Sequence, residues 1–207
     1  MLINTFFTPI QVTQHTHPLL NIELVKLAYK LKENPKNKRS YHLGWVSKIF
    51  QLEDSIYFKQ FFDDKLNDIN NFVSQYELIH NYNIKCDGIW FNINPQWAYN
   101  FTHTHSGSDF SAVYYLQIPK IKYQSGHDQG NKIVFDNPNP AQMNHPFYQK
   151  NMRYNEINSN TWGIEPKEDM LIMFPAHLPH RVNQNLSEKD RISIAFNFSI
   201  EQVDNDK

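Results

Sequence analysis

The chain contains a single cysteine, Cys86, so it cannot form an internal disulfide. Structural disulfides are typical of oxidising compartments, and a lone cysteine agrees with a reducing one. No run approaches the roughly 20 apolar residues that a membrane helix requires. The first residues, 1–13, also lack the basic start and apolar stretch of a signal peptide. We therefore expect a cytoplasmic protein with no membrane partner.

An excess of one charge is also missing. The 20 Lys and Arg residues are balanced by 21 Asp and Glu residues, which gives a formal net charge of −1. Proteins that bind nucleic acids usually carry a clustered excess of Lys and Arg, so a nucleic-acid partner is not expected. The chain has no internal repeat, and its 207 residues are enough for one domain with a hydrophobic core. Nothing in the sequence indicates an oligomeric state.

The chain divides into a helical first part and a β-rich second part. Apolar residues recur every three or four positions in 18–31 and 55–76, which predicts two helices. With a short strand at Leu2–Val12, these form an expected N-terminal region, 1–83, that supports a core at 84–207 in the same domain. The strands expected in the core are Gly88–Ile93, Trp97–His105, Phe110–Ile118, Lys132–Phe135, Met170–Phe174, His180–Asn183 and Arg191–Ser199.

Short strands at regular intervals after a helical start are typical of an antiparallel sandwich or barrel with supporting helices. One connection, Asn137–Trp162, is long, polar and contains proline. Loops of this length in a compact domain are often functional.

Two histidines, His103 and His105, are separated by one residue at the end of a predicted strand. Side chains two positions apart in a strand point to the same face, so both imidazoles can reach one metal ion. Imidazole suits Fe, Zn, Cu and Ni alike, so the pair predicts a metal without identifying it. The alternative is that both are surface or structural histidines that bind no metal.

A third histidine, His180, begins a later predicted strand. An HxH pair with a distant third ligand makes a set on one side of a metal and leaves positions open for substrate and O2. The nearby His177 precedes Pro179 in the turn before this strand. We interpret it as a turn residue.

The last predicted strand alternates between apolar and small or polar side chains. The apolar face holds Ile192, Ile194, Phe196 and Phe198, and the other face holds Arg191, Ser193, Ala195 and Asn197. One charge among small side chains is typical of a cavity lining with a buried arginine. Its planar guanidinium suits a carboxylate, which it binds through two parallel hydrogen bonds. An outer strand with a solvated face would show the same pattern.

A tyrosine, Tyr115, shares one face of the strand Phe110–Ile118 with Ser111 and Val113. Its hydroxyl would add a hydrogen bond to an anion held by Arg191, and core packing is the alternative. The aromatic residues Trp90, Trp97 and Phe135 are candidates for shaping a substrate pocket, or they pack in the core.

Four segments carry a family resemblance, and they are HTHSGSDFSAVYYLQIP, KIVFDNP, LIMFPAHLPHRV and DRISIAFNF, in this order. Each is short, but together their order and spacing resemble the 2-oxoglutarate/Fe(II) oxygenases of bacterial and phage genomes, distant relatives of the prolyl hydroxylases. The resemblance covers residues 89–199, which is roughly half of the chain.

This resemblance implies a mostly β protein with N-terminal supporting helices. Its core would be a double-stranded β-helix, that is, a jelly-roll or cupin-like barrel. His103 and His180 would be the first and last ligands of Fe(II). Arg191, with Ser193 and Tyr115, would bind the far carboxylate of the co-substrate 2-oxoglutarate. The enzyme would use O2 to hydroxylate a small-molecule or peptide substrate, with release of succinate and CO2.

The middle metal ligand departs from the family pattern, because His105 stands where relatives have Asp or Glu. Three-histidine sets occur in other non-haem iron dioxygenases, so His105 is the expected ligand. Asp109 is the alternative carboxylate, and otherwise a turn residue. Two further functions stay open at this point. One is a three-histidine dioxygenase or cupin-like enzyme that does not use 2-oxoglutarate, and the other is a non-catalytic interaction or virion module.

Overall fold

The computed structural model describes residues 8–39, 43–120, 130–138 and 159–203. The N-terminal region consists of β1 (Gln11–Gln14), α1 (Pro18–Glu33), a 3-10 turn (Pro35–Asn37), β2 (Lys38–Arg39), β3 (Trp45–Ser47), a second 3-10 turn (Leu52–Asp54) and α2 (Ile56–Ser74). The two predicted helices are therefore confirmed. Helix α1 begins at a proline, which suits a first turn that needs no N–H donor. At the start of α2 the Ser55 hydroxyl accepts a hydrogen bond from the Tyr57 backbone N–H.

The remaining elements are strands, and they are β4 (Tyr82–Asn94), β5 (Asn100–His103), β6 (Phe110–Gln117), β7 (Ile133–Asp136), β8 (Thr161–Ile164), β9 (Met170–Pro175), β10 (His180–Val182) and β11 (Arg191–Gln202). They form two antiparallel sheets. The larger sheet has the order β1-β9-β6-β11-β4-β3-β2, and the smaller one has the order β5-β10-β7-β8. This arrangement confirms the predicted double-stranded β-helix with supporting helices.

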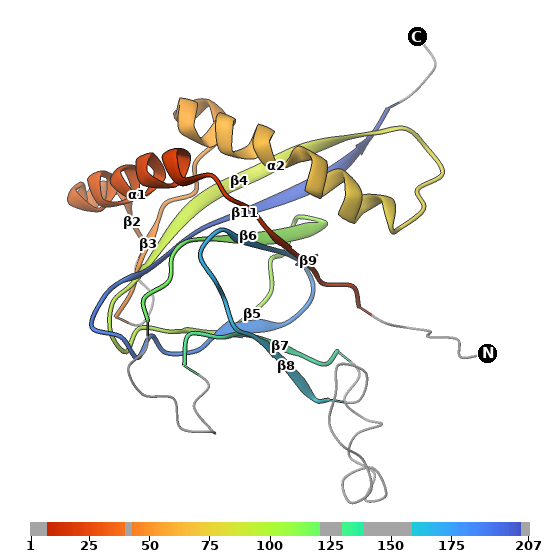
Figure 1. Ribbon diagram of the computed structural model, residues 1–207. Coiled ribbons are helices and arrows are strands. Elements are labelled where there is room, and N and C mark those ends of the chain that lie inside the picture. The colour runs from red at the N-terminus through yellow and green to blue at the C-terminus, as the bar shows by residue number, and fades with distance from the viewer. Residues whose placement is uncertain (1–7, 40–42, 121–129, 139–158, 204–207) are drawn as a thin grey trace, which may run out of the picture.

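Both helices pack on one face of the larger sheet, and the smaller sheet lies on the other side (Figure 1). The main core between helices and sheet is rich in aromatic rings, among them Phe61, Tyr114 and Phe196. The rings of Phe61 and Phe196 meet edge to face with their centroids 5.8 Å apart. A second, smaller cluster includes Tyr115, Phe135 and Phe174. One face of the larger sheet therefore packs against the helices in the main core. The other face, with the smaller cluster, points towards the smaller sheet.

Several boundaries differ from the predicted ones, for local reasons. Strand β5 begins only at Asn100, because Trp97 adopts a positive φ of 69° that a strand does not accommodate. Strands β2, β3 and β8 were not predicted. Most of the predicted loop Asn137–Trp162 and most of the strand Leu2–Val12 lie outside the described residues. The division at residues 83/84 stays a prediction.

Neither of the two helices, within the described part of the chain, is long and apolar enough to cross a bilayer.

Candidate metal centre and its cavity

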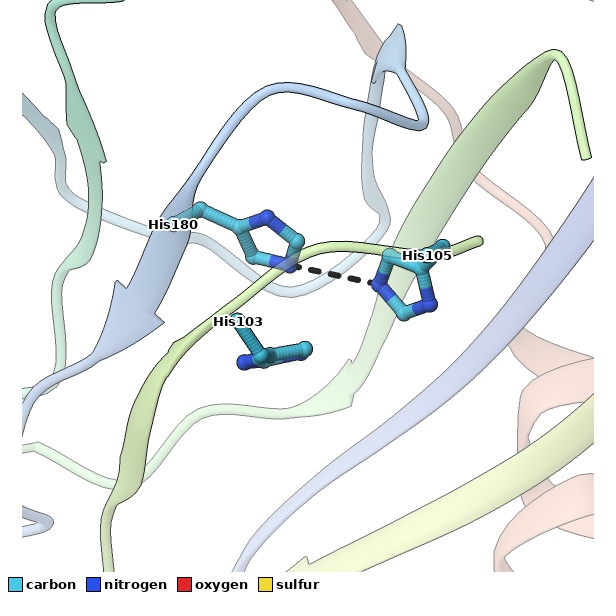
Figure 2. Close-up of side chains that lie close together, drawn as sticks. All are labelled: His103, His105 and His180. Carbon is cyan, nitrogen blue, oxygen red and sulfur yellow. Dashed lines mark hydrogen bonds between the residues drawn. The ribbon is translucent and has the colours of Figure 1, made fainter. Parts of the chain in front are cut away.

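The two sheets bring the three predicted histidines together from separate strands. His103 ends β5, His180 begins β10 and pairs with His103 in register, and His105 follows two residues after His103. The three rings turn towards a common point (Figure 2), and one ring nitrogen of each lies within 4.8 Å of the others. The Nε2 atoms of His105 and His180 are 3.3 Å apart. Two ligands at about 2.1 Å from one metal ion would be separated by a similar distance.

Backbone carbonyls orient two of the rings. The Nδ1 atom of His103 lies 2.7 Å from the Phe101 carbonyl oxygen, and Nδ1 of His180 lies 2.9 Å from the Leu178 carbonyl oxygen. Because a carbonyl only accepts, each Nδ1 carries the proton and donates it. The lone pair of each ring therefore lies on Nε2, towards the shared space. Such outer hydrogen bonds are a regular feature of histidines that bind metals.

Burial keeps two of the three imidazoles, those of His105 and His180, uncharged. It lowers the pKa of His180 to about 3, with smaller contributions from His103 and His105, and the Leu178 carbonyl acts in the opposite direction. Burial, followed by the proximity of His103, lowers the pKa of His105 to about 4. Metal ions bind the neutral form of imidazole, so at neutral pH these two rings are in the form that binds a metal.

The structure separates the alternative candidates from this cluster. The carboxylate of Asp109 accepts a 2.8 Å hydrogen bond from the backbone N–H of Ile200, and it does not belong to the cluster of possible ligands. His177 is exposed in the turn before β10. Of the two candidates for the middle position, His105 is therefore the one that lies with His103 and His180.

The histidines open into a cavity of about 680 Å³ between the two sheets. The inner face of β11 forms one wall of it, with Arg191, Ser193, Ala195 and Asn197 all among the lining residues. The opposite, apolar face of β11 is buried under the helices. The alternation predicted for this strand is thus confirmed, and the solvated-face alternative is wrong. Side chains of the described residues leave this cavity open rather than filling it.

Arg191 is fully buried, and among the described residues only one of its two terminal nitrogens has hydrogen-bond partners. Its Nη1 donates to the carbonyl oxygens of Asn131 and Asn183, at 3.2 and 3.0 Å, and to the Asn131 side chain. Its Nη2 has no hydrogen-bond partner in the described part of the chain. No carboxylate in the same part pairs with it, and burial lowers its pKa to about 10, which leaves it charged at neutral pH. A buried cation of this kind needs an anion.

Tyr115 lies beside Arg191 with a second unsatisfied group. It pairs with Ser193 across β6 and β11, and its hydroxyl has no hydrogen-bond partner among the described residues. Burial raises the pKa of Tyr115 to about 12, although the nearby Arg191 lowers it, so the phenol keeps its proton at neutral pH. One corner of the cavity therefore contains two hydrogen-bond donors that have no acceptor in the described part of the chain. They are Nη2 of Arg191 and the Tyr115 hydroxyl. Ser193 lines the same corner.

Other parts of the site were not predicted from the sequence. Asn131 holds Arg191 with both its backbone and its side chain, and a positive φ of 63° sets its position. Asparagine tolerates this conformation better than most residues, which is the only signal that the sequence offers. Of the three aromatic candidates, Trp90 lines the cavity, Phe135 packs in the second core cluster near His180, and Trp97 is exposed outside the cavity.

The family model described as "Putative 2OG-Fe(II) oxygenase" matches residues 88–197, more than half of the chain. No curated protein matches the chain. The chain therefore belongs to this family, and it is a 2-oxoglutarate- and Fe(II)-dependent oxygenase.

Solved structures of such enzymes share the fold. A Pseudomonas putida prolyl-4-hydroxylase is 14% identical with a TM-score of 0.61, and the match covers 93% of this chain and 92% of that one. A viral collagen prolyl hydroxylase from Paramecium Bursaria Chlorella virus-1, solved with 2-oxoglutarate, is 14% identical with a TM-score of 0.54, over 91% and 94%. The epimerase SnoN, solved with Fe3+, alpha ketoglutarate and nogalamycin RO, is 9% identical with a TM-score of 0.66, over 97% and 83%.

Proposed function

We propose that His103, His105 and His180 bind the Fe(II) ion of this oxygenase, and that Arg191, Tyr115 and Ser193 bind the far carboxylate of 2-oxoglutarate. One observation carries the proposal. A single cavity holds three converging imidazoles and, in another corner, a buried guanidinium next to a buried phenol. Among the described residues, neither Nη2 of this guanidinium nor the phenol hydroxyl has a hydrogen-bond partner.

The donor set fits a dicarboxylic acid. A carboxylate accepts two hydrogen bonds side by side, one from Nη2 of Arg191 and one from the Tyr115 hydroxyl, and it supplies the anion that the buried guanidinium lacks. The neutral histidine set adds no negative charge to the site, so a second carboxylate on the ligand is attracted to the metal. A ligand with an acid group at each end therefore satisfies both corners of the cavity.

The remaining residues orient and shield the reaction. Phe174 contacts the His180 ring with centroids 4.6 Å apart, and Trp90 lies against His105 at 5.6 Å. These rings limit the approach of water to one side of the histidines. When it is bound, iron would activate O2 as the oxidant, with one oxygen atom used to oxidise 2-oxoglutarate to succinate and CO2 and the other available to hydroxylate the substrate. The organic substrate then enters the part of the cavity that 2-oxoglutarate leaves free.

We infer a hydroxylation reaction on a small molecule or a peptide. The solved structures of this fold include the epimerase SnoN in complex with nogalamycin RO and a prolyl hydroxylase from Trichoplax adhaerens in complex with a peptide fragment, so this fold accommodates both kinds of molecule. A dioxygenase that does not use 2-oxoglutarate would leave Arg191 without a natural anion. For this reason we favour 2-oxoglutarate as the ligand of Arg191.

We also propose a cytoplasmic location, supported by the lone Cys86. Burial raises the pKa of its thiol to about 12, so it stays protonated and unreactive at neutral pH.

An anaerobic titration tests the metal and co-substrate assignment. Fe(II) is added to the metal-free protein, followed by 2-oxoglutarate, and a weak visible charge-transfer band reports the ternary complex. The wild type should form the band, and His180→Ala should not. The matched control is His177→Ala, which removes an exposed histidine three residues away and should keep the band. A His180→Ala variant with the full band would disprove the role of His180.

A further inference from the structure

We propose that the cavity contains a second polar subsite, at Asn197, which binds a hydrogen-bond donor of a neutral or anionic organic substrate. The subsite lies on the side of the histidines away from Arg191, and it selects against amines. The inference rests on the proposed function, because the metal and 2-oxoglutarate define the space that is left for the substrate.

The register of the sheet places Asn197 next to the histidines. Arg191 and Asn197 lie on the same face of β11, six residues or about 20 Å apart along the strand. Trp90 pairs with Ala195 across β4 and β11, and its ring contacts His105. The histidines therefore face the Ala195 end of the strand. Since 2-oxoglutarate extends from Arg191 towards the histidines, Asn197 borders the space beyond them.

Asn197 has an unsatisfied acceptor that the fold does not need. Its Oδ1 is covered by protein and has no hydrogen-bond partner in the described part of the chain. Three side chains of the cavity lining share this property, and the other two are Arg191 and Tyr115. A buried acceptor without a donor destabilises the folded state. Two of the three groups already have a ligand in the proposed function, and the third needs one with an N–H or O–H donor.

The charge of the lining determines which donors are acceptable. No Asp or Glu lines the cavity, whereas Arg39 and Arg191 do, as far as the structure describes the chain. The neutral polar side chains around it are amides and hydroxyls, such as Asn92, Thr102 and Ser111. An ammonium group beside Asn197 would be desolvated without an anion and would also face the metal ion. A hydroxyl or an amide N–H satisfies Oδ1 without this penalty.

Three probes that share a phenyl ring separate these possibilities. N-methylbenzamide has one N–H donor, N,N-dimethylbenzamide has none, and benzylammonium is a cation. The protein is loaded with Mn(II) in place of Fe(II) and with 2-oxoglutarate, and the paramagnetic relaxation of the probe protons is measured as each probe is titrated. The donor probe should bind roughly two- to tenfold more tightly than its dimethyl analogue, which is the net contribution of one hydrogen bond.

Two substitutions at one position should act in opposite directions. Asn197→Leu removes the acceptor at similar volume, so the preference for N-methylbenzamide should disappear. Asn197→Asp keeps an acceptor and adds a negative charge, so benzylammonium should gain affinity by roughly tenfold or more. General misfolding cannot produce a gain for one probe and a loss for another. In the metal-free protein, Asn197→Leu should raise Tm by about 2–4 °C, because it removes an unsatisfied buried group.

Four results would overturn the inference. They are equal relaxation of the two benzamides, preferential binding of benzylammonium to the wild type, a lower Tm for Asn197→Leu, and a loss of 2-oxoglutarate affinity in Asn197→Leu. The last result would assign Asn197 to the co-substrate instead. A failure of the proposed function would give a different result. In that case Mn(II) would relax no probe in the wild type, and the wild type and His180→Ala would give the same relaxation rates.

Discussion

The two faces of strand β11 belong to the same strand but have different surroundings. One packs in the core, and the other lines the cavity. The outer face, which consists of Ile192, Ile194, Phe196 and Phe198, is fully buried under the helices. The inner face, with Arg191, Ser193, Ala195 and Asn197, lines the cavity. Every group of the outer face has apolar neighbours, whereas Arg191 and Asn197 each hold a buried polar atom that has no partner in the described part of the chain.

This difference separates stability from function within a single strand. Burial of the outer face stabilises the fold, because apolar surface leaves water. The unsatisfied groups of the inner face destabilise it, and we propose that a ligand supplies their missing hydrogen-bond partners. Substitutions on the outer face should therefore reduce the free energy of unfolding, and substitutions on the inner face should reduce binding.

The largest effect on activity is expected at the candidate metal centre, whose histidines line the same cavity as the inner face of β11. His105→Leu should abolish Fe(II) binding and the release of succinate from 2-oxoglutarate. His105→Asp restores the carboxylate found at this position in relatives, and it should retain metal binding. Succinate release and iron content are measured for both variants. If His105→Leu kept the wild-type iron content, the middle ligand would have to be another residue.

The outer face should show the largest change in stability. Phe196 is fully buried and contacts Phe61 and Phe62 edge to face. Phe196→Ala should lower the free energy of unfolding by about 3–5 kcal/mol, measured by urea denaturation. Ser193→Ala, on the inner face of the same strand, is the control and should change it by less than about 1 kcal/mol. Equal destabilisation by the two variants would show that the inner face contributes to stability as much as the outer face does.

Arg191→Lys tests the inner face directly. Lysine keeps the positive charge but loses the planar pair of donors, so 2-oxoglutarate affinity should fall by roughly ten- to a hundredfold, or about 1.5–3 kcal/mol. Fe(II) affinity should stay close to that of the wild type, since Arg191 is not a ligand. Separate titrations of iron and 2-oxoglutarate distinguish the two effects. An unchanged affinity for 2-oxoglutarate would favour a dioxygenase that does not use this co-substrate.

The smallest effect is expected for Tyr115→Phe. Loss of one hydrogen bond should weaken 2-oxoglutarate binding by roughly two- to tenfold. The same change removes an unsatisfied buried hydroxyl, so the unliganded protein should be as stable as the wild type or slightly more stable. Calorimetric titration and thermal unfolding measure the two quantities. A clear loss of stability without a loss of affinity would make Tyr115 a core residue, as the alternative interpretation held.

The alternating pattern of β11 explains why much of the site was predictable. Period-two alternation fixes which side chains share a face, so the sequence predicted that Arg191 and Ser193 point away from Phe196. The HxH spacing likewise predicted that His103 and His105 lie near each other. The approach of His180 to this pair was first proposed from the pattern of an HxH pair with a distant third histidine, and the family resemblance then supported it. No local pattern encodes this contact, because the pairing of β5 with β10 joins segments far apart in the chain.

Other features depend on contacts that no local pattern encodes. Strand β1 pairs with β9, and the backbone of Asn131 reaches Arg191 across a long stretch of sequence. Strand β4 extends back to Tyr82, well before the predicted start at Gly88, because it follows β11 along its whole length. The isolated acceptor of Asn197 was also not apparent, since a missing partner is visible only when all neighbours are placed.

The most direct test is a crystal structure of the protein with Mn(II) and 2-oxoglutarate, grown without oxygen. We expect Nε2 atoms of His103, His105 and His180 at about 2.0–2.3 Å from one metal ion. We also expect the far carboxylate of 2-oxoglutarate within hydrogen-bond distance of Nη2 of Arg191 and the hydroxyl of Tyr115. A metal bound without His105, or a 2-oxoglutarate carboxylate that does not contact Arg191, would contradict the account.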